Sequence, residues 1–554
     1  MKRNHYILAG ILCTTFPLFT QAQNQPADST LIRTVVVEQE YNPDIMDASK
    51  VNVLPPVEEP TVSRKEVAYD ATLNPATALP SDPIGAYTAP EAQQRYTPGY
   101  VRAGYGSRGN LDLFANYLFR LSGRDKLDVN FRMEGMNGKT DDLIRGGTWS
   151  SFYYRTRGQA LYQHTFNSLD LNIGGSFGQS NFNLTPQSLV PKQKLSSGHA
   201  HIGVLSTDNE APLHYKAETR ILFYNRQHDA YSTGNKETLI RTKADVRGEL
   251  QEDQFIGIAV EMNNLFYSYE QTDIEADNYT TVDLNPYFLW NTDTWDLRLG
   301  AHADFSLGTG TTFRASPDVE AGYTFSDTYR VYASATGGRR LNDFRTLEEN
   351  SPYGIIRQGK PEDTYELIHA TLGLKGSPLP GTWFHIFGGY RNIKKELYHS
   401  SALFSTGNDG VEAILYQTAN SDNLHGGAEL GYAYKDLLSL SFTATGYHWN
   451  SKEDFALLLK PVFAGKAEAG FRPVHPLWIT AGYEYIQREK VSSYGGENGS
   501  LPAIHDLRLS ATYNFYKGVS IYAHVNNLLN KKNQYYINYP VQGFNFLGGL
   551  SFRF

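Results

Sequence analysis

The sequence predicts an all-β chain: a transmembrane antiparallel β-barrel of about 22 strands (18 to 22), preceded by an extended Pro-rich segment. Three observations predict it: long runs in which apolar and polar residues alternate, connections that alternate between short turns and long loops, and an unusual composition. Only 19% of the 554 residues are charged, while 49 are Gly and 38 are Tyr, which is unlike an ordinary soluble enzyme. No run of 18 apolar residues occurs, so a helical membrane protein is excluded.

Residues 1–22 have the pattern of a secretory signal peptide, because Lys2 and Arg3 precede an apolar run and a small-x-small cleavage pattern ends at Ala22. The one cysteine, Cys13, is removed with this leader. The mature chain therefore needs a large core or a closed hydrogen-bonded sheet in place of disulfides. Its formal net charge changes from -8 to -10 (48 basic against 58 acidic residues), which argues against nucleic acid as a partner.

Residues 23–98 are expected to form an extended periplasmic segment without a core of its own. Ten of the 25 prolines lie here, and proline at this density removes amide donors and prevents long helices and central strands. One short strand-like stretch, Thr34-Val35-Val36-Val37, interrupts it. We expect this stretch to pair with a sheet edge or to bind a periplasmic or membrane partner protein.

Residues 99–554 alternate with period two, as in Trp295 to Leu307, where apolar side chains share one face and polar side chains the other. These runs have the roughly 9 to 11 residues that a tilted strand needs to cross a bilayer. The predicted strands are 100–106, 111–121, 126–136, 153–164, 169–179, 199–206, 213–225, 240–251, 255–268, 280–290, 295–307, 313–325, 329–340, 366–376, 383–398, 424–434, 438–450, 457–471, 478–488, 507–515, 519–528 and 544–554.

The connections discriminate further. Short turns such as 122–125 and 516–518 alternate with longer polar loops such as 179–198 and 341–365. Short periplasmic turns and long outer loops are typical of outer-membrane barrels. Four tryptophans lie beside predicted short turns, where amphipathic rings favour the membrane interface, and they are expected to form a girdle: Trp290, Trp295, Trp383 and Trp478.

The predicted inward face carries charges of both signs. A basic side chain at the bilayer midplane costs roughly 2 to 4 kcal/mol, so these residues are expected to line an interior. They are Asp112, Arg120, Asp128, Arg132, Glu134, Asp170, Lys243, Asp245, Arg247, Glu249, Arg298, Asp304, Lys466, Glu468 and Arg508. A polar lumen of this kind fits water or packed polar protein and disfavours a fatty-acid conduit.

No catalytic, cofactor-binding or metal-binding residue is predicted. The Gly-rich strings at 104–109 and 174–178 lack the helix and the sharp turn that their chemistry needs. The acidic residues of 273–277 are interpreted as a solvated loop, and His302 and His524 as polar lumen groups. A barrel acyl hydrolase would need a serine and a histidine on adjacent strands, and none is expected.

The end of the chain resembles the barrel of TonB-dependent receptors. The resemblance is carried by residues 519–532, with the Asn-Leu-Leu-Asn-Lys-Lys step at 527–532, and by the aromatic terminal strand 548–554. It implies an assembly signal read by the barrel-insertion machinery, with lipid-facing Leu550, Phe552 and Phe554. It also implies that Thr34 to Val37 is similar to a TonB box.

The front of the chain departs from that family, because about 75 Pro-rich residues stand where a globular plug of well over a hundred is expected. A 22-stranded barrel has a lumen that needs filling. Either the Pro-rich segment or the outer loops fold in, or a partner fills it, or it is open. We therefore expect a non-enzymatic outer-membrane protein acting as a channel-like or scaffold subunit of a complex. The alternative is a TonB-linked nutrient transporter with a borrowed or rudimentary plug.

Overall fold

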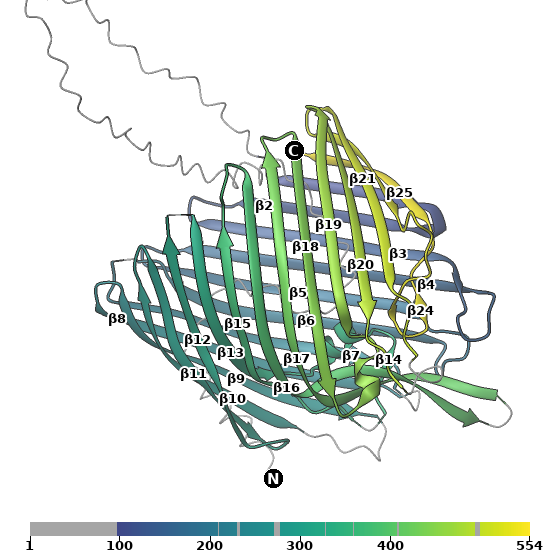
Figure 1. Cartoon of the computed structure of the whole chain (residues 1–554), viewed down its shortest axis with the longest axis horizontal. Helices are drawn as coiled ribbons and strands as arrows, with labels where there is room; N and C mark the ends of the chain where they lie inside the picture. The colour runs from purple at the N-terminus through teal and green to yellow at the C-terminus, as the bar shows by residue number, and fades with distance from the viewer. Residues whose placement is uncertain are drawn as a thin grey trace, which may run out of the picture. The chain divides into compact units, whose positions relative to one another are not determined.

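The computed structural model describes residues 97–554, except 209, 230–232, 271–277, 327, 358, 407–408 and 493–498. These residues form one antiparallel sheet that closes on itself, since β1 pairs with both β2 and the last strand, β25. The sheet has 23 strands, and subtracting the two-residue β14, which only joins β17 in parallel, leaves 22 in the barrel. The predicted fold class and strand number are confirmed. Figure 1 shows the strands side by side around the wall of the barrel.

The 22 barrel strands run in sequence around the wall. They are β1 Gly99–Gly106, β2 Leu111–Arg120, β3 Asp125–Asp141, β4 Thr148–Thr165, β5 Leu169–Asn183, β6 Lys192–Ser206, β7 Leu213–Arg226, β8 Asn235–Gln251, β9 Gln254–Tyr269, β10 Tyr279–Asn291, β11 Trp295–Leu307, β12 Phe313–Phe325, β13 Tyr329–Arg340, β15 Thr364–Gly376, β16 Thr382–Thr406, β17 Asp409–Tyr434, β18 Leu438–Ser451, β19 Pro461–Val474, β20 Leu477–Arg488, β21 Ile504–Tyr516, β22 Val519–Asn526 and β25 Asn545–Arg553.

The remaining elements lie in the connections at one end. They are the 3-10 turns η1 Ser107–Gly109 and η2 Asp454–Leu457, the helix α3 Phe344–Asn350, and the short strands β14 Gly354–Ile355, β23 Gln534–Tyr536 and β24 Tyr539–Pro540. Among the described helices, none is long and apolar enough to span a membrane. The two ends of the barrel are therefore unlike: one has tight turns, and the other has loops with structure of their own.

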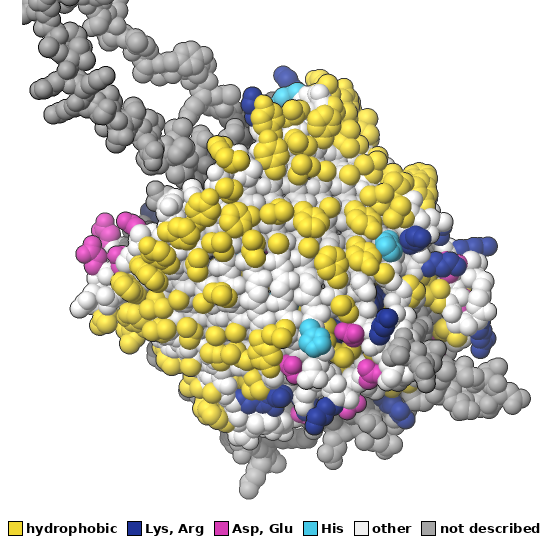
Figure 2. Space-filling model, in the orientation of Figure 1, with side chains coloured by type: hydrophobic (Ala, Val, Ile, Leu, Met, Phe, Trp, Pro, Cys, Tyr) yellow, Lys and Arg dark blue, Asp and Glu magenta, His cyan; other side chains and the backbone are white. Residues whose placement is uncertain are grey.

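Alternation places apolar side chains outside and polar side chains inside. Ile256 and Leu372 are 60% and 62% exposed on the outer face, whereas Asp304 and Asp318 are 2% and 5% exposed within the wall. Figure 2 shows hydrophobic side chains over the visible face of the barrel, with charged side chains gathered toward its ends. An apolar band with charged rims is the surface that a bilayer-spanning barrel requires.

Several strands are longer than the alternating pattern predicts, and the largest extensions are those of β16 and β17. β16 has 25 residues and β17 has 26, and their pairing continues from Glu396↔Ala419 to Thr406↔Asp409. A β-bulge interrupts the register between Ile393 and Glu396, where Lys395 has φ 52°. A bulge bends a strand, so the hairpin 396–419 changes direction as it leaves the wall.

Candidate functional site: the lid over the long-loop end

The long-loop end of the barrel is covered by four connections, which we call the lid: residues 341–363, 396–419, 452–460 and 527–544. The innermost part is helix α3. Asp343 caps its first turn by accepting a hydrogen bond from the Thr346 amide at 2.8 Å. The Phe344 amide donates to Glu237 on β8 at 2.9 Å. These two contacts fix the start of α3 against the inner wall.

Glu348 on α3 is a buried carboxylate held by three donors from the wall. It accepts hydrogen bonds from Tyr224 OH at 2.5 Å, Ser180 Oγ at 2.7 Å and Arg157 Nη2 at 3.2 Å. Burial disfavours the charged carboxyl, but Arg157 and the bonds from Tyr224 and Ser180 outweigh it and lower the pKa of Glu348. The helix is thus tied to β4 by an ion pair and to β5 and β7 by hydrogen bonds.

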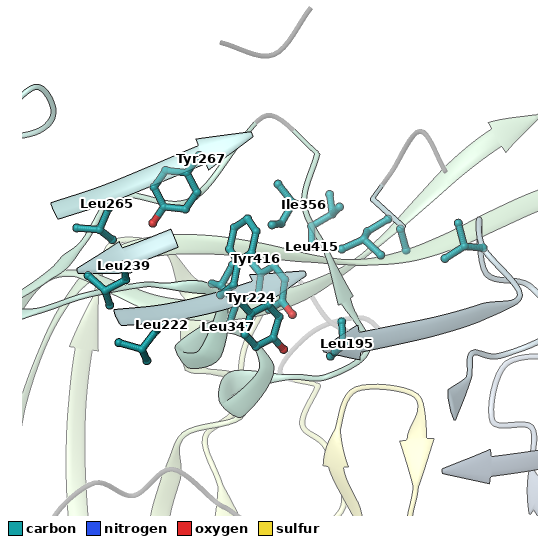
Figure 3. Packing of buried hydrophobic residues seen from close by; sticks show 14 of the residues in the cluster. Leu195, Leu222, Tyr224, Leu239, Leu265, Tyr267, Leu347, Ile356, Leu415 and Tyr416 are labelled. Atoms are coloured by element: carbon teal, nitrogen blue, oxygen red, sulfur yellow. The ribbon is translucent and has the colours of Figure 1, made fainter. Parts of the chain in front are cut away.

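The apolar side of α3 packs into a continuous core between the lid and the strand wall. Phe344 and Leu347 are fully buried. Figure 3 shows Leu347 beside the rings of Tyr224 and Tyr416, with the wall residues Leu222, Leu239 and Leu265 to the left. The buried members are Phe182, Leu184, Val190, Leu195, Leu222, Tyr224, Leu239, Leu265, Tyr267, Tyr279, Phe344, Leu347, Ile355, Ile356, Ala413, Leu415 and Tyr416. Such a core excludes water from this part of the lumen.

The hairpin 396–419 reaches the opposite wall of the barrel. Its Glu412 amide donates to the Gln187 carbonyl at 2.8 Å, and the Leu189 amide donates to the Glu412 carbonyl at 3.3 Å. Residues 187 and 189 belong to the connection between β5 and β6, far from β16 and β17 around the sheet. The hairpin therefore lies across the mouth of the barrel.

Buried polar contacts fasten this hairpin to the loop beneath it. Arg226, which is fully buried, donates to the Gly354 carbonyl at 2.5 Å and to Tyr416 OH at 3.3 Å. Tyr416 OH donates to the Ser351 carbonyl at 2.6 Å. β14 adds backbone pairing, Gly354↔Ile414. Wall, loop and hairpin are thus held as one unit.

Tyr353 joins this core to a second one formed by the later loops. Its ring stacks on Tyr539 with centroids 3.7 Å apart and meets Phe182 edge-on at 5.4 Å. Burial raises the pKa of Tyr353 well above its usual value, so the phenol is neutral. The second core comprises Ile414, Trp449, Leu457, Leu458, Val491, Leu501, Ile537 and Tyr539. The lid therefore contacts strands on both sides of the mouth.

Toward the short-turn end the inner wall is polar, as predicted. Charged side chains pair across neighbouring strands, for example Lys243 Nζ with Glu261 at 2.7 Å and Arg298 Nε with Asp318 at 2.7 Å. The pair Lys466 and Glu468, 2.7 Å apart, keeps about half of each side chain exposed. The expected mixed-sign interior is confirmed for these residues.

The predicted site residues are placed as follows. Thr34 to Val37 and the acidic loop 273–277 lie outside the described residues. Leu550, Phe552 and Phe554 are 56%, 45% and 47% exposed along the closing strand. Their role as an assembly signal stays a prediction.

The four tryptophans of the predicted girdle differ in exposure. Trp290, Trp295 and Trp383 are 36%, 45% and 45% exposed. Trp478 is only 9% exposed, and the Arg472 guanidinium lies 5.5 Å from its ring. The Trp295 ring lies 4.5 Å from the Tyr323 ring on the neighbouring strand. The interface role of all four stays a prediction.

The expectation that no serine and histidine meet on adjacent strands is wrong. Ser176 on β5 and His199 on β6 are directly paired, and their Oγ and Nδ1 atoms are 2.5 Å apart. A hydrolytic triad uses Nε2 for the serine and leaves Nδ1 for an acid. Ser176 occupies the Nδ1 position, and its strand offers no free amide pair for an oxyanion because β5 is paired on both sides. The contact is a hydrogen bond of the inner wall.

His302 and His524 lie among polar neighbours of the wall. His302 Nδ1 is 2.8 Å from Asp283, and the Tyr522 ring lies 5.2 Å from that of His524. Within the described part of the chain, no group of three metal-ligating side chains gathers.

The lid is the feature that sequence reasoning missed. The sequence predicts a polar outer loop at 341–365, yet this loop carries Phe344, Leu347, Tyr353 and Ile355, all of which pack inward. Several apolar residues inside a predicted surface loop are the signal that could have revealed it. Of the possible fillings of the lumen, inward folding of the outer loops is therefore observed at this end.

No protein-family model matches the sequence, and no curated protein matches it. Solved structures, in contrast, do match this chain. The siderophore receptor PirA from Pseudomonas aeruginosa is 10% identical over 82% of this chain and 80% of its own, with a TM-score of 0.59. The FrpB iron transporter from Neisseria meningitidis (F5-1 variant, apoprotein) is 12% identical over 83% and 81%, with a TM-score of 0.63. The copper transporter OprC is 12% identical over 82% and 80%, with a TM-score of 0.59. The chain therefore shares the outer-membrane barrel fold of TonB-dependent receptors and transporters, which its terminal strands resemble.

Proposed function

We propose that this chain is a non-enzymatic scaffold subunit of an outer-membrane complex, with a barrel closed by its own lid. The observation that supports it is the lid core, in which Phe344, Leu347 and Ile355 are at most 1% exposed. An open channel needs a continuous water path, and a packed core across the mouth, tied to the wall through Glu348, opposes one. Of the two roles expected from the sequence, the geometry favours the scaffold over the channel.

The proposal assigns residues 23–98 to the periplasm, as an arm that holds a partner protein. Its support is compositional: ten prolines and the strand-like stretch Thr34 to Val37 in a segment too short for a plug. The terminal residues Leu550, Phe552 and Phe554 are assigned to recognition by the barrel-insertion machinery.

Electrical conductance of the purified full chain in a planar bilayer tests the closed state. We expect no steady conductance from the intact protein. Replacing residues 344–356 with a Gly/Ser linker removes α3 and β14. This variant should show the large conductance steps that are typical of a wide pore. Steady, large conductance of the intact chain would overturn the closed-barrel proposal.

The scaffold role is tested by identifying the proteins that co-purify with the chain in mild detergent. Deleting residues 24–95 should release partner proteins while the barrel remains in the membrane. Recovery of the same complexes from the deletion would contradict the proposed arm.

A TonB-linked transporter is the second candidate. It is supported by the fold shared with receptors and transporters and by the resemblance of Thr34 to Val37 to a TonB box. In a transporter the lid would have to move during each cycle. Val36→Pro should then abolish energy-dependent uptake while leaving the isolated barrel unchanged, whereas a scaffold shows no such uptake in either form.

A further inference from the structure

The outer, lipid-facing side of β17 to β21 contains a groove of about 430 Å³. Its floor is formed by small side chains, Ala467 and Ala469 on β19 and Ala481 on β20. Phe442 pairs across from Ala467 on one side, and Tyr483 pairs across from it on the other. The large rings thus form the walls of an apolar channel that follows the strands.

This groove lies near the short-turn end of the barrel. Tyr432, which lines it, is two residues from the end of β17, and Leu440 is two residues from the start of β18. At roughly 3.3 Å per residue, the lining from these positions to Phe442 lies within about 13 Å of the turns. With the short turns on the periplasmic side, the groove opens to the inner leaflet.

The three turns that close the strands of the groove each carry an exposed basic group: Lys435, His475 and Lys517. The one acid among them, Asp436, already pairs with Arg472 at 2.9 Å. No acidic side chain of the described residues pairs with Lys435 or Lys517. Positive charge therefore gathers at the mouth of the groove.

Two turns elsewhere on the same rim are acidic. The turn between β8 and β9 carries Glu252 and Asp253, and the turn between β10 and β11 carries Asp293, all exposed. Figure 2 shows the same division, with basic side chains at the top of the view and acidic ones at its left edge. The turn between β2 and β3 also carries a basic residue, Arg124, so the contrast is between the basic turns beside the groove and the acidic turns between β8 and β11.

We propose that this groove binds an anionic phospholipid of the inner leaflet, with an acyl chain over Ala467, Ala469 and Ala481 and the phosphate at the rim between the turns of Lys435 and Lys517. A hydrocarbon chain fits because every strand of the groove is already paired on both sides and cannot accept another strand. Lys435 and Lys517, which form no ion pair among the described residues, supply the preference for negative charge.

Lipid retention by the purified full chain tests the proposal. The protein in detergent is titrated with phosphatidylglycerol or phosphatidylethanolamine, and bound lipid is counted by native mass spectrometry. Lys435→Gln and Lys517→Gln should each weaken binding of phosphatidylglycerol roughly fivefold and leave binding of phosphatidylethanolamine unchanged. Ala469→Leu combined with Ala481→Leu should fill the floor and weaken both lipids.

Matched controls separate the groove from general effects. Arg124→Gln removes an exposed charge from the turn between β2 and β3, and Ala333→Leu enlarges an exposed alanine of β13. Neither substitution should change the retention of phosphatidylglycerol or of phosphatidylethanolamine. Equal retention of both lipids by the unchanged chain, or unchanged retention in the filled variant, would overturn the proposal. The proposal would also be overturned if a partner protein co-purified with the unchanged chain but not with the Ala469→Leu, Ala481→Leu variant. The groove would then be a protein-binding site.

Discussion

The two halves of the barrel interior hold their charged groups in different ways. In the lid, Glu348 is buried with three donors from the wall. Near the short turns, Lys466 and Glu468 pair while half exposed. Removing one partner of a buried ion pair typically costs about 3 to 5 kcal/mol, whereas exposed pairs contribute about 0 to 1 kcal/mol. The charged groups in the lid therefore stabilise the structure, whereas those of the inner wall near the short turns remain hydrated.

The largest effect is expected from Glu348→Ala. It leaves the buried Tyr224 and Ser180, and the partly exposed Arg157, without their acceptor, so the free energy of opening α3 should fall by about 3 to 5 kcal/mol. Hydrogen exchange of the amides of residues 347–350 measures this opening. Glu348→Gln keeps an acceptor and should lose less. Unchanged exchange in the alanine variant would show that the buried carboxylate does not hold the lid.

The apolar side of α3 should respond nearly as strongly. Leu347→Ala removes a fully buried side chain and should lower the opening free energy by about 2 to 5 kcal/mol, by the same exchange measurement. Leu372→Ala is the control, because Leu372 is 62% exposed on the outer face. If both variants exchange alike, the core shown in Figure 3 does not stabilise the helix.

Acid should weaken the lid through Glu348. Its pKa is lowered in the folded protein, so its contribution is complete above the ordinary value of 4.5 and is lost as the pH falls through the lowered value. Bilayer conductance should therefore rise only below pH 4.5, and less than for Glu348→Ala, since a protonated carboxyl still forms hydrogen bonds. In Glu348→Gln this acid step should be missing. A step of equal size in that variant would assign the titration to another group.

The same division between the two halves explains what the sequence could predict. The strands Trp295–Leu307 and Phe313–Phe325 begin and end where alternation and turn residues place them. These boundaries depend on local chemistry, since lipid outside and water inside impose period two. In contrast, β17 was expected to start at 424 but starts at Asp409. That extension depends on packing of Leu415 and Tyr416 against α3, which no local pattern encodes.

The site divides in the same way. The charged inner wall follows from alternation, so Lys466 and Glu468 could be assigned to the lumen without a structure. The partners of Glu348 could not be predicted. Arg157, Ser180 and Tyr224 lie on strands far from Glu348 in the sequence, and only tertiary packing brings them together. The Ser176 and His199 contact was missed for a related reason: it requires the exact pairing of β5 with β6.

The smallest effect is expected at the exposed pair. Lys466→Ala breaks its 2.7 Å contact with Glu468, but both side chains are about half exposed and water replaces the lost partner. The free energy of unfolding should change by at most about 1 kcal/mol, and exchange of α3 should not change. Glu468→Ala and the double variant complete a cycle that isolates the pair. Denaturant unfolding of the folded barrel measures all three, and a coupling of several kcal/mol would contradict the distinction between a hydrated wall and a structural lid.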